Sequence, residues 1–413
     1  MERVVSAIGL VAFVGIAWAL SEDRRRAPWR LVAIGVALQF ALALLVLRTG
    51  LGVAFFEAVR KTFDVVRIAT LEGSRFIFGS LTDVIVLNQD AVSGADGPFV
   101  INAVVAFQVL PIIIFVSTVA GILYHLGVIQ AIVRGMAWLM RRTLKTSGAE
   151  TFGVASQVFM GIESMPTLKA YLREMTRSEL LTVMTSFMAS VAANVLVLYA
   201  TFGAEPGHLL AASIMSAPAA IVIAKLLVPE TQTPRTAGID RIEVEVESHN
   251  IMDGAARGAS EGVTLAINVC ALLIAFVSLV YLVNLGFSAV TGKTFTELAG
   301  WFFYPFAVLM GVPLQDATEV GRLLATKTVV NELIAYTNMQ TLIADGALQP
   351  RSITIATYAL CGFANPGSLG ILLACLVGLA PDRRKDITQL GIKSLIGGTL
   401  AVFMTASIAG IIA

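Results

Sequence analysis

The sequence contains few charged residues for its length. Of its 413 residues, 14% are Asp, Glu, Lys or Arg and 57% are hydrophobic, with a mean hydropathy of +0.82. A soluble globular protein carries about 25% charged residues, so this chain has too few charges to cover a soluble surface. Together with apolar runs of about twenty residues, the deficit excludes a soluble enzyme, a disordered chain and a fibrous protein. The composition predicts a polytopic membrane protein.

Cysteine and histidine are scarce as well, with three residues of each. Cys270, Cys361 and Cys375 lie in apolar stretches, so we predict buried thiols rather than disulfides. No cysteine or carboxylate stands at metal-ligand spacing from a histidine, which argues against a zinc-type centre. The first apolar run lacks a small-residue cleavage site, so we expect a retained helix rather than a signal peptide.

Long apolar runs are the main feature that the sequence does have. A helix needs about 20 mostly apolar residues to cross a bilayer, and runs of that kind predict about eight transmembrane helices. They cover residues 4–20, 31–47, 98–126, 180–203, 207–228, 262–287, 352–380 and 388–412. Residues 51–70 are amphipathic and predict a helix that lies in the membrane interface. Residues 134–145 and 229–258 predict a basic and a polar linker.

Two further stretches are half apolar, and both are broken. Residues 151–172 contain Glu163 and Pro166, and residues 301–336 are interrupted by Gly311-Val-Pro. If both termini lie outside, the short loops rich in Lys and Arg are cytoplasmic, as the positive-inside rule requires. The loops alternate between the two sides of the membrane in this way only if each broken stretch enters and leaves the membrane on the same side. We therefore predict an all-α polytopic membrane protein with about eight transmembrane helices plus two oppositely oriented re-entrant hairpins.

The two halves of the chain mirror each other. Each contains a hairpin, then a span interrupted by small and polar residues (188–194 and 361–368), then an uninterrupted span. Broken helices at matching positions are typical of secondary transporters with inverted repeats, whose substrate lies near the bilayer midplane. Two loosely packed helices with Gly and Pro are the alternative. The expected domains are N-terminal helices, interfacial helix and scaffold (1–148), a first transport repeat (149–230), a cytoplasmic linker and central span (231–298) and a second transport repeat (299–413).

Glu332 lies in an otherwise apolar run. A carboxylate at membrane depth costs about 2.5–3.5 kcal/mol, so it normally faces a cavity or a partner; an ion pair with Lys327 is the alternative. Asn365 and Ser368 are three residues apart, so on a helix their side chains point the same way, and Pro366 between them frees backbone carbonyls. Together with Glu332 they suit the hydroxyls of a sugar or polyol. Alone, they also suit helix–helix hydrogen bonds.

The first hairpin contains a second carboxylate, Glu163, followed by Ser164. Gln157 lies nearby in the sequence, and Ser190 lies in the matching interrupted span. An oxygen-rich pocket of such side chains and unwound carbonyls would suit a sodium ion. A string that resembles a nucleophile motif, residues 258–262, has no strand before it and no histidine as base, so we predict that the chain is not an enzyme.

At these residues the sequence resembles the concentrative nucleoside transporter family. Residues 325–336, Ala-Thr-Lys-Thr-Val-Val-Asn-Glu-Leu-Ile-Ala-Tyr, are close to the family's Gly-x-Lys-Thr-x-x-Asn-Glu-Phe-x-Ala-Tyr. Residues 361–368 match its Cys-Gly-Phe-Ala-Asn-x-x-Ser in full, and residues 208–218 and 225–231 also look like family segments. The resemblance covers nearly the whole chain in order.

The resemblance implies a homotrimeric symporter in the cell (inner) membrane that imports nucleosides with sodium, which we favour, or with protons. No nucleic acid and no cofactor are expected as partners. The residues that the resemblance assigns to the ribose are Glu332, Asn365 and Ser368. Phe363 would line the site, and Val195 would pack on the nucleobase. The implied sodium ligands are the side chains of Gln157 and Ser190 and the backbone of Met160 and Val191.

Two departures from the family pattern limit what carries over. The family has Asn at the position of Gln157, which bears on the identity of the ion. The family tip reads Gly-Gln-Thr/Ser/Asn-Glu and contacts the base, whereas this chain reads Gly161-Ile-Glu-Ser. An alignment that counts forward from Gly161 places Ser164 at the position of the family's glutamate. An alignment that counts back from Ser190 places Glu163 at that position, and we prefer this second alignment. Because no residue replaces the glutamine, the preferred base stays open, and another ribosyl or polyol substrate is the alternative.

Overall fold

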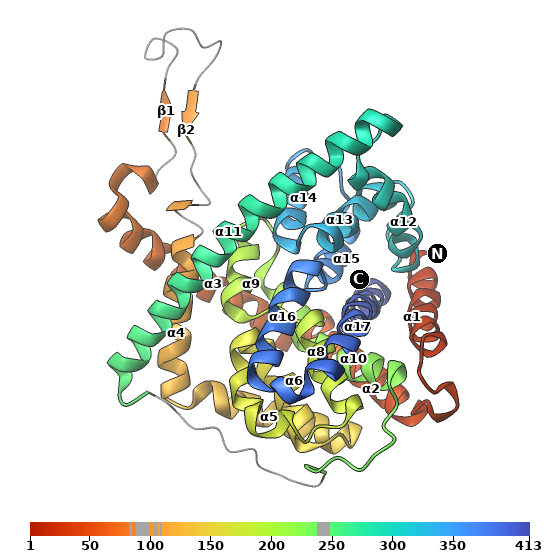
Figure 1. The fold of residues 1–413 in the computed structure, drawn as a ribbon. Coiled ribbons are helices and arrows are strands. Elements are labelled where there is room, and N and C mark those ends of the chain that lie inside the picture. The colour runs from red at the N-terminus through yellow and green to blue at the C-terminus, as the bar shows by residue number, and fades with distance from the viewer. Residues whose placement is uncertain (83–84, 88–98, 102–105, 108–109, 238–247) are drawn as a thin grey trace.

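The computed structural model runs from Met1 to Ala413, and the structure is described for residues 1–82, 85–87, 99–101, 106–107, 110–237 and 248–413. The fold consists almost entirely of helices (Figure 1). Two three-residue strands, β1 (Ile85–Leu87) and β2 (Phe99–Ile101), form a small antiparallel pair with Val86 opposite Val100. Apart from this pair, the predicted all-α class is confirmed.

The helices follow one another in three groups. The N-terminal group comprises α1 (Glu2–Ala19), η1 (Arg24–Arg26), α2 (Trp29–Arg48), α3 (Gly50–Phe78), η2 (Gly79–Thr82), α4 (Leu110–His125) and α5 (Val128–Leu144). The second group comprises α6 (Gly148–Met160), η5 (Gly161–Leu168), α7 (Lys169–Leu172), α8 (Arg177–Ala189), α9 (Ala193–Ala200), α10 (Pro206–Leu227) and α11 (Ile251–Thr291). The third comprises α12 (Phe295–Leu309), α13 (Ala317–Val329), α14 (Glu332–Ala344), α15 (Pro350–Leu360), α16 (Pro366–Leu379), η6 (Pro381–Arg383) and α17 (Arg384–Ile412).

Length and apolar composition identify six helices in the described residues that could cross a membrane. They are α1, α2, the broken pair α8–α9, α10, α11, and the helix that includes α17. The bent pair α4–α5 makes a seventh if it is counted as one span. The predicted span at residues 352–380 consists of α15 and α16, which are separated by a break and are each too short to cross alone. A polytopic membrane protein with broken spans is therefore what the structure describes.

Three predicted boundaries are wrong. Residues 134–145 are not a linker, because they belong to α5, an amphipathic helix bent by 75° from α4. The third span begins at Leu110 rather than at residue 98, since residues 99–101 form β2; part of the predicted span, residues 102–105 and 108–109, lies outside the described residues. The polar linker ends earlier than predicted, where the Asn250 side chain caps α11 by accepting from the amide of Asp253.

The first predicted hairpin is formed by α6, η5 and α7. α6 ends at Met160, and Gly161 turns the chain with a φ of +57°, which L side chains rarely adopt. A Cβ at this glycine would lie 2.8 Å from the Cβ of Ala192, so the tip contacts the break between α8 and α9. The hairpin therefore meets the interrupted span of its own repeat.

The second predicted hairpin lies within residues 301–336, but with more detail than the sequence indicated. The break at residues 310–316 ends α12 and is followed by α13, and the hairpin itself consists of α13 and α14 with its tip at Val330 and Asn331. α12 packs along α13 on the outside of this hairpin. The stretch therefore contains two reversals of the chain rather than one.

A buried ion network fixes the base of the first hairpin. The ammonium of Lys225 on α10 lies 2.7 Å from a carboxylate oxygen of Glu150 at the start of α6 and 3.3 Å from one of Glu230. Glu150 completes a capping box with Ser147. At the other end of the hairpin, Arg383 donates to the backbone oxygens of Leu172, Arg173 and Met175. Both limbs of the hairpin are thus held to the surrounding helices, which leaves its tip as the part that faces the interior.

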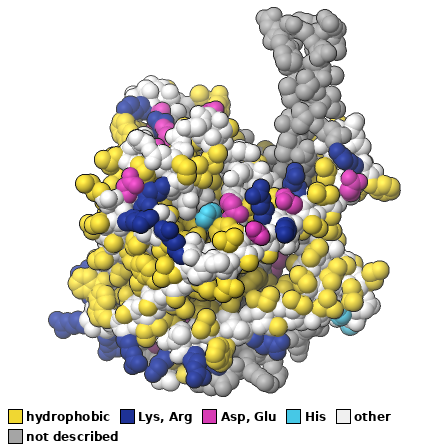
Figure 2. Space-filling model, turned by 180° about the vertical axis from the view of Figure 1, so that it is seen from behind, with side chains coloured by type: hydrophobic (Ala, Val, Ile, Leu, Met, Phe, Trp, Pro, Cys, Tyr) yellow, Lys and Arg dark blue, Asp and Glu magenta, His cyan; other side chains and the backbone are white. Residues whose placement is uncertain are grey.

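The two repeats share a central core, and one helix stands apart from it. α17 packs against α1, α8, α10 and α15, and its residues are mostly buried. α11 crosses the molecule diagonally (Figure 1) and packs mainly on α4, with most of its remaining surface exposed. Figure 2 shows hydrophobic side chains over much of the opposite face, with Lys and Arg side chains along the lower edge and others, next to Asp and Glu, in the middle and upper half. A broad hydrophobic surface is typical of a protein that contacts lipid.

Glycines allow α4 and α11 to approach closely. Gly254, Gly258 and Gly262 recur every four residues on the face of α11 that touches α4. A Cβ at Gly258 would lie 2.3 Å from the backbone oxygen of Ser117. The string that resembles a nucleophile motif is therefore part of a helix-packing stripe, in which small residues bring two backbones together.

We expect Gly258→Ala to destabilise the protein, because the added methyl would push α4 and α11 apart. Overpacking of this kind typically costs about 1–3 kcal/mol. The measurement is the melting temperature of the purified protein in detergent. Gly286→Ala is the matched control, since a Cβ there meets nothing within 4 Å on the same helix. Equal melting temperatures for the two variants would contradict the packing described here.

Candidate functional site

The carboxylate of Glu332 lies where the second hairpin meets two broken spans. It is the first residue of α14 and is 6% exposed. One of its oxygens accepts from the hydroxyl of Tyr199 on α9 at 2.6 Å, and the other accepts from the amide nitrogen of Asn365 at 2.7 Å. A carboxylate offers about four lone-pair sites, so it can accept more hydrogen bonds than these two. The alternative that the sequence left open, an ion pair of Glu332 with Lys327, is not formed among the described residues, and the ammonium of that lysine donates to the backbone oxygen of Ala359.

Two asparagines fix the helix ends around this carboxylate. The side-chain oxygen of Asn331 accepts from the amide of Ile334 and caps α14, and that of Asn365 accepts from the amide of Ser368 and caps α16. Asparagine is a favoured N-cap because its oxygen satisfies an amide that the helix cannot. The cap bond also leaves the Asn365 amide group pointed at Glu332. Asn365 thus both begins α16 and directs its amide group to the carboxylate of Glu332.

Aromatic side chains enclose the same region. Tyr199 stacks on Tyr336 with their ring centroids 4.8 Å apart. The ring centroids of Phe363 and Phe187 are 5.5 Å apart. Phe363 is half-buried, and Val195 is buried one turn before Tyr199 on α9. The predicted residues Glu332, Phe363 and Asn365 therefore lie together. Ser368 is half-buried at the start of α16, where its amide donates to Asn365.

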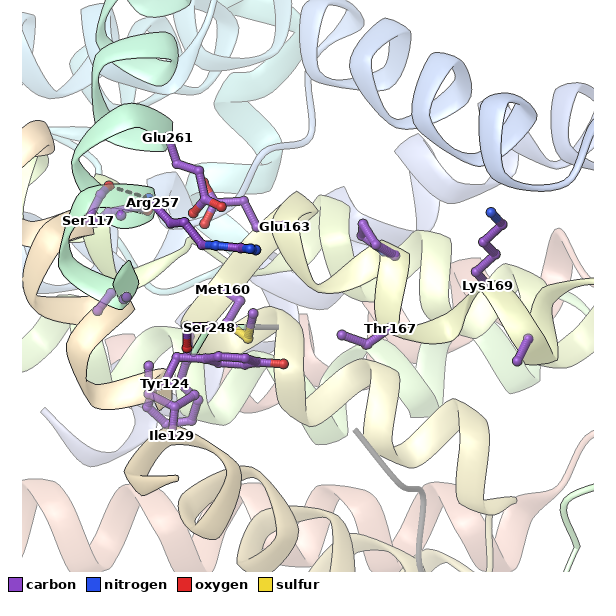
Figure 3. Close-up of a pocket in the computed structure, with 18 of the residues that line it drawn as sticks. Ser117, Tyr124, Ile129, Met160, Glu163, Thr167, Lys169, Ser248, Arg257 and Glu261 are labelled. Atoms are coloured by element: carbon purple, nitrogen blue, oxygen red, sulfur yellow. Dashed lines mark hydrogen bonds between the residues drawn. The ribbon is translucent and has the colours of Figure 1, made fainter. Parts of the chain in front are cut away.

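A cavity of about 880 Å³ opens beside the tip of the first hairpin. Its lining includes Met160 and Glu163 from the hairpin, Asn194 from α9 and Glu261 from α11. Figure 3 shows the side chains of Glu163 and Glu261 extending toward one another, with Arg257 beside them. The amide group of Asn194 lines the same part of the cavity as the carboxylate of Glu163. The tip thus presents one carboxylate to a space large enough for a small organic molecule.

The structure separates Glu163 from Ser164. Ser164 is fully buried, and its hydroxyl donates to the backbone oxygen of Gly161 at 2.7 Å, within the turn. It is absent from the residues that line the cavity, whereas Glu163 is among them. Of the two predicted tip residues, only Glu163 is in a position to meet a ligand in this conformation.

The predicted sodium ligands gather at the end of α8. A Cβ at Gly153 would contact Val183 on α8, and a Cβ at Gly161 would contact Ala192 just after α8. Gln157 lies midway between these two glycines and is therefore at the level of the last turn of α8. The side-chain oxygen of Gln157 is buried and has no hydrogen-bond partner among the described residues. Ser190 donates to the backbone oxygen of Ser186 at 2.8 Å and keeps its lone pairs free.

The remaining two predicted ligands are backbone groups. The backbone oxygen of Val191 accepts from the hydroxyl of Ser213 at 3.0 Å, and Met160 ends α6 beside the turn. Burying a hydrogen-bond acceptor without a hydrogen-bond donor costs free energy. A hard cation, which prefers oxygen ligands, can satisfy such an acceptor instead. The donor set therefore fits a cation such as sodium.

Sequence reasoning missed three residues of this region. Tyr199 lies in an apolar helix and resembles a core residue; its signal is a buried hydroxyl, which needs a partner. Asn194 belongs to the interrupted span at residues 188–194. Glu261 lies within residues 258–262, which resemble a nucleophile motif. None of the three is adjacent in sequence to the group that it faces.

Comparison with known families gives profile matches along most of the chain. Residues 8–81 match the family described as Na+ dependent nucleoside transporter N-terminus, and residues 208–410 match its C-terminus. Residues 106–206 match a family described as Nucleoside recognition, named Gate. Among curated proteins, the uncharacterized transporter YutK of Bacillus subtilis is 38% identical and aligns over 98% of both chains. The chain belongs to the concentrative nucleoside transporter family. The family assignment inferred from residues 325–336 and 361–368 is confirmed.

Other relatives of this transporter are longer. Solute carrier family 28 member 3 of Mus musculus is 39% identical over the whole of this chain, which spans 59% of the mouse protein's length. Sodium/nucleoside cotransporter 1 of Rattus norvegicus is 34% identical, with the chain spanning 64% of it. These relatives are transporters, and the prediction that the chain is not an enzyme is confirmed.

Solved structures show the same fold. CNTnw in an inward-facing substrate-bound state is 37% identical, with a TM-score of 0.89 over all of this chain and 99% of that one. A variant of CNTnw in an outward-facing state gives a TM-score of 0.90 at 36% identity, over all of this chain and 99% of that one. This transporter therefore has the transporter fold with its two hairpins, as the sequence predicted.

Proposed function

We propose that this protein is a symporter that imports nucleosides together with a cation, with sodium favoured over protons. The observation that carries the proposal is the buried carboxylate of Glu332, held by Tyr199 and Asn365 at the meeting point of a hairpin and two broken spans. A carboxylate can accept from more than two donors, which suits the hydroxyls of a ligand. We assign the ribose to Glu332, Asn365 and Ser368.

The nucleobase end of the site would lie at the first hairpin. Asn194 and Tyr199 are on the same helix, five residues and hence about 7 Å apart along its axis. Tyr199 donates to Glu332, and Asn194 lines the same cavity as Glu163, so α9 extends from one carboxylate toward the other. Val195 lies between these ends, which supports its assignment as a packing surface for the base. Phe363 would close the site on the other side.

The cation would bind where the first hairpin meets the end of α8. The unpartnered oxygen of Gln157 and the hydroxyl of Ser190 supply side-chain ligands, and the backbone oxygens of Met160 and Val191 complete the set. The family descriptions that match this chain name a Na+ dependence. The extra methylene of Gln157, relative to the family's Asn, alters the size of this pocket, which is why protons remain the alternative.

Exposed apolar side chains bear on the proposed assembly. α11 is a 41-residue helix with large exposed apolar side chains, such as Ile274, Tyr281 and Leu282, which suit lipid or a second copy of the chain. We propose a homotrimer in the cell (inner) membrane with both termini outside, the orientation that places the short loops rich in Lys and Arg in the cytoplasm. We keep the domain division at residues 1–148, 149–230, 231–298 and 299–413.

Counterflow in proteoliposomes tests this function. The purified protein is reconstituted, and exchange of labelled purine and pyrimidine nucleosides is measured with and without an inward sodium gradient, and with a pH gradient alone. We expect exchange of at least one nucleoside and accumulation that follows sodium. Exchange of ribose or ribitol without any nucleoside would support the alternative of a ribosyl or polyol transporter, which the incomplete hairpin tip leaves open. No exchange of any of these would refute the proposal.

We expect Glu163→Gln to change the order in which nucleobases compete for uptake. Glu163 faces the cavity as an acceptor, and an amide would add a donor, so bases that present donors should lose affinity relative to bases that present carbonyls. Competition by 2′- and 3′-deoxynucleosides should stay weak, because the ribose site is separate. The measurement is inhibition of labelled uptake by a nucleoside series.

Ser164→Ala is the companion variant for this test, because its hydroxyl is bonded within the turn. We expect it to keep the wild-type order of bases in the described conformation. If both variants keep the wild-type order and affinities, the first hairpin does not recognise the base.

A further inference from the structure

Lys327 is a charged side chain in the interior of the second repeat that the binding site does not use. It is 2% exposed, and its ammonium donates to the backbone oxygen of Ala359 at 2.8 Å. Within the described part of the chain no carboxylate pairs with it directly. A buried ammonium is expensive unless its donors are satisfied, so its position against a backbone oxygen calls for a physical reason.

The reason lies in the end of α15. A helix that stops inside the membrane leaves its last carbonyl oxygens without amides, and no water reaches them there. In this break the hydroxyl of Tyr336 donates to the oxygen of Thr357 at 2.8 Å, and Lys327 donates to that of Ala359. Both donors come from the second hairpin. A positive charge at a helix C-terminus is also favoured by the helix dipole.

The corresponding place in the first repeat has the opposite chemistry. α6 and α13 are both 13 residues long, and each leads to the tip of its hairpin beside a broken span. Gln157 stands three residues before the end of α6, and Lys327 stands two residues before the end of α13. At the first place, the side-chain oxygens of Gln157 and Ser186 are buried and have no hydrogen-bond partner in the part of the chain that the structure describes. One repeat therefore offers unsatisfied oxygens, and the other offers a cation.

We propose that the ammonium of Lys327 is a built-in cation that takes, in the second repeat, the place that the transported cation takes in the first. This inference rests on the proposed function. Lys327 acts as a positioning residue: it holds the end of α15, from which the chain continues to Asn365 and its contact with Glu332. The second repeat then needs no ion, and the chain couples to a single cation at the end of α8.

The first test is the number of sodium ions that wild-type protein uses. Sodium dependence of nucleoside uptake is measured in proteoliposomes. We expect a Hill coefficient of about 1, since the coefficient cannot exceed the number of sites. A coefficient clearly above 1 would overturn the proposal. Uptake that requires no cation would instead refute the proposed function, so the two failures are distinguishable.

The second test compares two replacements of Lys327. Lys327→Met fills the space without charge, and Lys327→Ala leaves room for a small cation. We expect both to raise the nucleoside KM about tenfold or more, the usual effect of losing a charged hydrogen bond. High sodium or methylammonium should restore uptake by Lys327→Ala, with a sodium Hill coefficient approaching 2, and should not restore Lys327→Met. A wild-type KM in Lys327→Met, or equal responses of the two variants, would overturn the proposal.

A double variant separates this role from simple charge balance with Glu332. If Lys327 served only to neutralise Glu332, the pair Lys327→Met and Glu332→Gln would recover the melting temperature lost by Lys327→Met alone. We expect no recovery, because the oxygen of Ala359 stays unsatisfied. Melting in detergent reports this even where the variants do not transport. Full recovery would overturn the proposal.

Discussion

Replacing Glu332 with Gln should nearly abolish nucleoside uptake while the protein still inserts and assembles. The carboxylate accepts from both Tyr199 and Asn365 and keeps acceptor positions for the ribose. An amide has a single acceptor oxygen, so one of the two donors would lose its partner and the ribose would lose a charged acceptor. The loss of a charged hydrogen bond costs about 1.5–3 kcal/mol, roughly 10- to 150-fold in affinity. The measurement is initial uptake of a labelled nucleoside into proteoliposomes.

A matched control is available on the neighbouring helix. Glu319 lies on α13, is partly exposed and pairs with Arg322 at 3.0 Å. Glu319→Gln should leave uptake unchanged, because such exposed pairs contribute little. Size-exclusion chromatography checks that both variants retain the wild-type assembly. Uptake by Glu332→Gln within about twofold of wild type would contradict the ribose assignment.

The sequence located Glu332 because a carboxylate in an apolar run is rare and costly, so its position alone carries information. The broken spans were predictable for a similar reason, since residues 361–368 combine Asn, Pro and Gly where a continuous helix would exclude them. By contrast, Tyr199 could not be identified, because its partner Glu332 is 133 residues away and a tyrosine in an apolar helix usually fills a core. Long-range partners depend on the fold, which the local pattern does not specify.

The hairpin tip shows a second limit of sequence reasoning. Glu163 and Ser164 are adjacent and both polar, so either suited a ligand-binding role. Only the turn at Gly161 decides between them, because it directs the serine hydroxyl back to its own backbone and the carboxylate into the cavity. α5 was misassigned for a related reason, since basic residues that follow a span indicate a linker unless the apolar residues between them recur with a helical period.

Changes at the cation ligands should raise the sodium concentration needed for half-maximal uptake without changing the nucleoside KM at saturating sodium. Gln157→Leu removes the unpartnered buried oxygen, and Ser190→Ala removes a hydroxyl at the break. Each deletes one oxygen ligand of a hard cation, and a shift of roughly tenfold is expected from the loss of one charged contact. Sodium titrations of uptake by each variant provide the measurement.

Two buried serines serve as controls for these sodium titrations. Ser156 precedes Gln157 on α6 and donates to the backbone oxygen of Phe152 at 2.8 Å. Ser216 on α10 donates to the backbone oxygen of Ala212 at 2.8 Å. Both bonds resemble the bond of 2.8 Å that Ser190 donates to the last turn of α8. Ser156→Ala and Ser216→Ala should leave the sodium dependence unchanged, because neither stands at the break in a span. If all four variants shift alike, the effect is one of packing rather than ligation. If uptake by Gln157→Leu and Ser190→Ala ignores sodium and follows pH as in wild type, protons are the coupling ion, and the oxygens at the end of α8 are not the site that binds them.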